Sequence, residues 1–160
     1  MPYSPLAIAN EFIRNASADG KGLEHMKLQK LVHFALGYAL KDGYELVNEN
    51  PQVWRYGPVF PSLYQDLKYH GSEPIKKLEP ENYFGSVPEV EDTDKRTKEL
   101  VAKVWKKYKN YTSFQLSDMT HRPGTPWYDL VVEHKGRVPM GLDIPTEAIK
   151  KHYEALPGLE

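Results

Sequence analysis

Apolar residues recur at the spacing of an amphipathic helix in two segments near the start of the chain. The first follows Ser4, which is a good N-cap, and Pro5, which suits the first helical position, and it ends in the glycine-containing stretch 17–22. The second, 25–41, is apolar around most of its circumference, which is typical of a central helix. We expect 25–41 to be the core helix.

The remaining pattern predicts shorter helices separated by proline and glycine. We expect them at about 61–70 and 93–109, from Thr112, over Trp127–Val132 and from near Pro145. Thr112 is followed three positions later by Gln115, which fits a capping box. The sequence therefore predicts a mainly α fold, a single compact domain over 1–160 with about six to seven helices. Minor β structure, a short strand or hairpin, is expected around 51–57 and 75–90.

Composition excludes several classes of protein. There is no cysteine, so disulfides and thiolate chemistry are absent. The net charge is −1, which argues against nucleic acid as a partner. No apolar run approaches the ~18 residues that cross a membrane, and the first residues lack the pattern of a signal peptide. We expect a cytoplasmic protein without a membrane partner.

Catalytic and metal-binding signatures are also missing. Common motifs for zinc hydrolysis, serine nucleophiles and nucleotide binding do not occur, and no two of the six histidines are spaced for one metal on one helix. We expect no catalytic residues, no metal and no cofactor. An alternative is a small hydrolase-like enzyme that uses His121, because Ser117 and His121 lie on one helical face beside Asp118.

The stretch WRYGPVFPS (54–62) combines aromatic residues, an arginine and two prolines. Trp, Tyr and Arg are enriched at interface hot spots, and proline lowers the ordering cost of binding. The alternative is structural: Trp54 and Tyr56 fill the core while Arg55 binds a helix C-terminus. The residues alone leave both readings open.

Five segments together resemble a known family, and they are ANEFI (9–13), MKLQKLVHFALGYAL (26–40), VWRYGPVFPSLYQDLKYHG (53–71), QLSDMTHRPGTPW (115–127) and IPTEAIKKHY (144–153). Their order resembles the Panacea, or SocA-like, antitoxin domain, whose members are often described as phage-associated proteins. The resemblance implies an antitoxin that neutralises a cognate toxin by direct protein binding. It also allows an adaptor that delivers the toxin to a cytoplasmic AAA+ protease. It implies a mainly helical domain and transfers no catalytic set.

For an antitoxin, the expected toxin-contacting residues come from two of these segments. From the first we expect Trp54, Arg55, Tyr56 and Pro58 to bind the partner, and from the second His121 and Trp127. The same residues could instead be a signature of the fold, because a domain that serves many toxins need not keep one binding surface.

Overall fold

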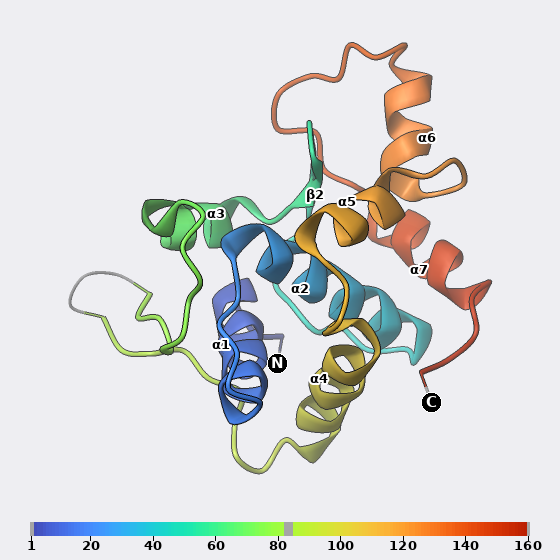
Figure 1. Cartoon of the computed structure of the whole chain (residues 1–160). Helices are drawn as coiled ribbons and strands as arrows, with labels where there is room; N and C mark the ends of the chain where they lie inside the picture. The colour runs from blue at the N-terminus through green and yellow to red at the C-terminus, as the bar shows by residue number, and fades with distance from the viewer. Residues whose placement is uncertain (1, 82–84, 160) are drawn as a thin grey trace.

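The computed structural model describes residues 2–81 and 85–159, and within them the chain is mainly helical, as predicted (Figure 1). The described elements are α1 (Pro5–Ala18), α2 (His25–Lys41), β1 (Gln52–Trp54), β2 (Gly57–Val59), α3 (Pro61–Leu67), the 3-10 helix η1 (Lys68–His70), α4 (Lys95–Tyr108), α5 (Ser113–His121), α6 (Pro126–Glu133) and α7 (Thr146–Glu154). No helix in these residues has the length and apolar character needed to cross a membrane.

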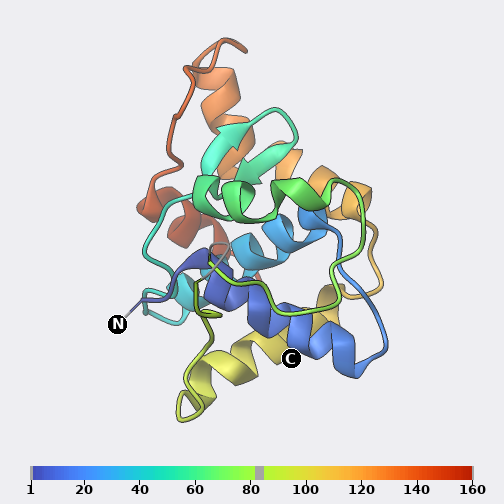
Figure 2. The ribbon, with the colours of Figure 1, turned by 90° about the vertical axis from the view of Figure 1, so that its left-hand side faces the viewer.

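Helix α2 is the core helix, which confirms the prediction from its apolar circumference. It packs against α1, α4, α5 and α7, and it runs through the middle of the molecule in both ribbon views (Figures 1 and 2). Leu28, Leu31 and Val32 are completely buried. The contact between α2 and α7 is especially close, because Gly37 faces the ring of Tyr153.

Local capping signals explain where the helices begin. The Ser4 side chain accepts a hydrogen bond from the Ala7 amide, and Thr112 and Gln115 form both hydrogen bonds of the capping box. Helix α4 begins at Lys95, after the N-cap Asp94, slightly later than the predicted 93. The Asp94 carboxylate accepts from the Thr97 amide, which fixes the start there.

The predicted β structure around 51–57 is an antiparallel hairpin in which Gln52 pairs with Val59 and Trp54 pairs with Gly57. In the second predicted region, around 75–90, Ile75 forms an isolated bridge with Leu23, and 82–84 lie outside the described residues. The buried Asn10 holds this irregular segment to α1: its side-chain amide donates to the carbonyls of Glu79 and Pro88.

Candidate partner-binding surface

Two adjacent polar residues of α2 hold one side of the hairpin. The Gln29 side chain accepts from the Phe60 amide at 2.8 Å and donates to the Phe60 carbonyl at 3.3 Å. Lys30 Nζ donates to the Pro58 carbonyl at 3.0 Å. Both side chains are almost fully buried, so these bonds satisfy polar groups that water does not reach. The segment 26–40 thus meets the segment 53–71 through specific hydrogen bonds.

Side chains from 115–127 hold the tip of the hairpin from the other side. Trp127 Nε1 donates to the Trp54 carbonyl at 2.7 Å, and Ser117 Oγ donates to the Tyr56 carbonyl at 2.7 Å. Between them, His121 Nε2 lies 3.2 Å from the Arg55 carbonyl oxygen. Three consecutive carbonyls of the tip therefore each lie beside a side chain of α5 or α6, and the hydrogen bonds from Trp127 and Ser117 restrain the backbone.

The packing beneath the tip leaves no room for a side chain at Gly57. Its φ is +111°, a conformation that glycine adopts readily, and an added Cβ would lie 2.7 Å from Thr120 Oγ1 and 3.1 Å from Lys30 Cε.

Burial lowers the pKa of Lys30 to about 7. Among the described residues, no carboxylate forms an ion pair with its ammonium group. The backbone of the hairpin is thus in direct contact with a buried amine.

The structure brings the six predicted contact residues into one region but exposes them unequally. Arg55 and Tyr56 point outward, and Tyr56 is 56% exposed, so Tyr56 does not fill the core as the structural alternative required. Trp54 is half-buried against Tyr64, with ring centroids 4.9 Å apart. Pro58 is buried.

His121 at the end of α5 and Trp127 in α6 pack against the tip of the hairpin. Both are half-buried, and their rings meet edge to face with centroids 4.3 Å apart. Trp127 also donates a hydrogen bond to the hairpin backbone, and His121 Nε2 lies beside the Arg55 carbonyl. His121 and Trp127 therefore pack against the backbone of the tip, whereas the side chains of Arg55 and Tyr56 point into solvent.

The hydrolase constellation of Ser117, His121 and Asp118 is not assembled. The hydroxyl of Ser117 donates to Tyr56, and His121 Nδ1 lies 2.6 Å from the Ser117 carbonyl oxygen. The Asp118 carboxylate binds Arg122 at 3.2 Å instead of the imidazole. Residues 2–81 and 85–159 also contain no group of three or more ligating side chains that could hold a metal ion.

Sequence reasoning missed Phe114, which is 88% exposed on α5. It lies about one turn before Ser117, the residue that binds the Tyr56 carbonyl. The helical period could have revealed this exposure. The buried residues of α5 are Leu116 and Thr120, and Phe114 lies about 200° around the helix from Leu116. Phe114 is therefore an exposed aromatic residue that a contact prediction could have included.

Comparison with known proteins gives two matches. Residues 28–128 match the family model described as "Antitoxin SocA-like, Panacea domain". A curated relative, Antitoxin SocA of Caulobacter vibrioides (strain NA1000 / CB15N), is 30% identical over 156 residues, which cover 92% of this chain and 80% of the relative. No solved structure gives a significant match. The region matched by the family model contains every side chain that holds the hairpin tip.

Proposed function

The chain belongs to the family of SocA-like antitoxins with a Panacea domain, and from this premise we propose that it neutralises the toxin encoded beside it by direct protein–protein binding. Family membership supports an antitoxin role and implies a toxin as partner. We further propose that the complex forms in the cytoplasm and that the bound antitoxin occludes the toxin's functional surface.

We assign the contact to the hairpin-tip surface, defined as Arg55, Tyr56 and Phe114. All three side chains are exposed. The Arg55 guanidinium lies 5.5 Å from the centre of the Tyr56 ring, within range of a cation–π contact. Tyrosine and arginine are the residue types that most often dominate binding energies. Arg55 and Tyr56 therefore offer adjacent anchors on the hairpin, and Phe114 adds an exposed aromatic ring on α5, the helix that holds the tip.

One observation carries the proposal: the tip backbone is held by side chains of α5 and α6 while the side chains of Arg55 and Tyr56 face solvent. The bonds from Trp127 and Ser117 fix the carbonyls of Trp54 and Tyr56, and His121 packs against the Arg55 carbonyl between them. A backbone that is ordered before binding loses little conformational entropy in the complex. This arrangement favours a preorganised recognition element over a turn that only links two strands.

Binding to the toxin encoded by the neighbouring gene tests whether the hairpin-tip surface forms the contact. We expect Arg55→Ala combined with Tyr56→Ala to weaken the complex at least tenfold, or about 1.4 kcal/mol, because hot-spot truncations typically cost more than about 1 kcal/mol each. The measurement is calorimetric titration, accompanied by rescue of growth on co-expression. Arg137→Ala, at an exposed arginine outside the hairpin-tip surface, is the matched control.

Two outcomes would contradict the proposal in different ways. Unchanged affinity in the double variant, with a wild-type melting temperature, would move the interface away from the hairpin tip. A wild-type complex that shortens the toxin's half-life only when an AAA+ protease is present would replace occlusion by proteolytic delivery. A pulse-chase measurement of the toxin in strains with and without the protease separates these mechanisms.

A further inference from the structure

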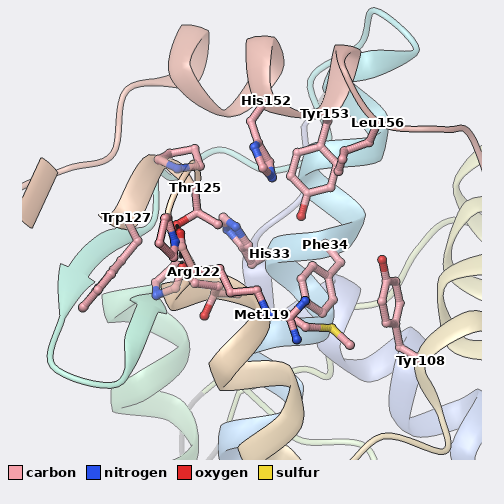
Figure 3. Close-up of a pocket in the computed structure, with 14 residues that line it drawn as sticks. His33, Phe34, Tyr108, Met119, Arg122, Thr125, Trp127, His152, Tyr153 and Leu156 are labelled. Carbon is pink, nitrogen blue, oxygen red and sulfur yellow. Dashed lines mark hydrogen bonds between the residues drawn. The ribbon is translucent and has the colours of Figure 1, made fainter. Parts of the chain in front are cut away.

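A cleft of about 260 Å³ lies between α2, α7 and the loop that joins α5 to α6 (Figure 3). Its walls include four aromatic side chains, those of Phe34, Tyr108, Trp127 and Tyr153. Figure 3 shows His33 of α2 and His152 of α7 projecting into the same space. The cleft therefore combines flat apolar walls with two imidazoles.

The interior of the cleft offers hydrogen bonds without charge. His33 Nδ1 is buried and has no hydrogen-bond partner among the described residues. Burial lowers the pKa of His33 to about 3 and also lowers the pKa of His152, so both rings are neutral near pH 7. A buried polar atom without a partner costs about 1–3 kcal/mol, so His33 is a strained feature of the cleft wall.

The size of the cleft limits what it can hold. An apolar cavity of about 150 Å³ accommodates benzene, and sites for drug-sized molecules start at about 300 Å³. At about 260 Å³, the cleft suits one phenol or indole group. The aromatic walls favour a planar group, and the neutral imidazoles favour one that carries an uncharged donor or acceptor on its edge.

The cleft is continuous with the hairpin. Pro58 of β2 and Trp127 of α6 form part of its wall, and Trp127 also donates to the Trp54 carbonyl at the hairpin tip. Arg122, which is exposed, lies at the rim of the cleft. A protein that covers the tip would therefore lie close to the cleft opening.

We propose that this cleft receives one uncharged aromatic side chain, tryptophan or tyrosine, from the toxin. The inference rests on the proposed function and adds an anchoring site to the hairpin-tip surface. An aromatic side chain inserted into a desolvated pocket is the usual form of a dominant interface contact.

Filling the cleft tests this proposal. Leu156 lines the cleft near the end of the chain and is half-buried, so Leu156→Trp should occupy the space with little effect on the fold. Leu159→Trp is the matched control, because Leu159 is also half-buried but lines a different pocket beside Lys41 and Leu100. We expect Leu156→Trp to weaken toxin binding at least tenfold and Leu159→Trp to change it less than twofold, both measured by calorimetry.

A probe of the free protein gives a second readout. We expect 3-methylindole, the side-chain analogue of tryptophan, to shift the NMR signals of the His33 imidazole and the Trp127 indole saturably, and Leu156→Trp to abolish these shifts. Absence of wild-type shifts would overturn the proposal. So would full toxin affinity in Leu156→Trp, even if 3-methylindole binds, because the cleft would then be a site for free small molecules.

The anchoring site and the antitoxin function can be refuted separately. If the wild type binds the toxin and Leu156→Trp binds it equally well, the anchoring site is wrong and the antitoxin function stands. If the wild type binds no toxin, the proposed function is wrong and the anchoring site falls with it. The titration with 3-methylindole then shows whether the cleft binds an aromatic ring at all.

Discussion

At the scale of single residues, Lys30 shows how one buried side chain joins two distant segments. Its stem packs in the core beside Gly57, and its amine hydrogen-bonds Pro58. Burial of a charged amine without a carboxylate partner is costly, and proteins relieve the cost by lowering the pKa. Lys30 therefore holds the hairpin while making the folded state sensitive to pH.

We predict that Lys30 makes stability rise with pH above neutrality. The folded pKa is about 7 and the ordinary value is 10.5, so between them the unfolded chain binds more protons and raising the pH favours folding. The free energy of unfolding should increase from pH 7.5 to 9.5, by up to about 1.4 kcal/mol per pH unit from this group. Urea denaturation at several pH values measures it. Lys30→Met should flatten the profile, and an equal slope in that variant would refute the assignment.

At the scale of elements, the most extensive helix contact is the one between α2 and α7. Gly37 has no side chain, and the Tyr153 ring occupies the space where one would lie. The same ring stacks edge to face on Tyr38, with centroids 5.0 Å apart. Position 37 therefore sets how near α7 can approach the core helix, and with it the width of the cleft.

Gly37→Ala should destabilise the protein although alanine is the better helix former. An added Cβ would lie 2.2 Å from Tyr153 Cε2, and overpacking of this kind costs about 1–3 kcal/mol, more than the roughly 1 kcal/mol gained in helix propensity. Thermal and urea denaturation measure the loss. In a Tyr153→Ala background the clash is gone, so Gly37→Ala should be neutral or stabilising there. The same loss in both backgrounds would contradict this explanation.

At the scale of the whole molecule, buried ionisable groups on α2 and elsewhere set the stability profile in acid. His25 and His33 are buried, and burial lowers their pKa values to about 4 and about 3. Asp66 acts in the opposite direction, because burial raises its pKa to about 6. The change in the free energy of unfolding with falling pH is the sum of the contributions of these groups. Substituting one histidine isolates its own contribution.

His33→Phe should make the protein less sensitive to acid. The unfolded imidazole has a pKa near 6.5, above the folded value, so His33 lowers stability as the pH falls from about 6.5 toward 3. The variant should be as stable as the wild type at pH 7, since Nδ1 has no partner to lose, and should lose less stability between pH 6 and 4.5. Denaturant titrations at both pH values test this, and parallel profiles would exclude His33 as the cause.

Much of the helical framework was predictable because its signals are local. Ser4, Thr112 and Gln115 act on amides a few residues away, and the apolar circumference of 25–41 needs only the helical period to be recognised. The extent of a single domain over 1–160 stays a prediction. The candidate site was predictable only in part: its six residues gather in one region, but Phe114 was missed and the roles within the group were not apparent.

The sequence by itself determined the helices, their caps and the resemblance that proved to be family membership. Only the tertiary structure decided that Tyr56 faces solvent, that Gln29 and Lys30 bind β2 and its flanking residue, and that Trp127 serves both hairpin and cleft. The physical reason is distance along the chain. A helix cap finds its partner within one turn, whereas a buried polar side chain is satisfied by whichever backbone group the packing brings to it.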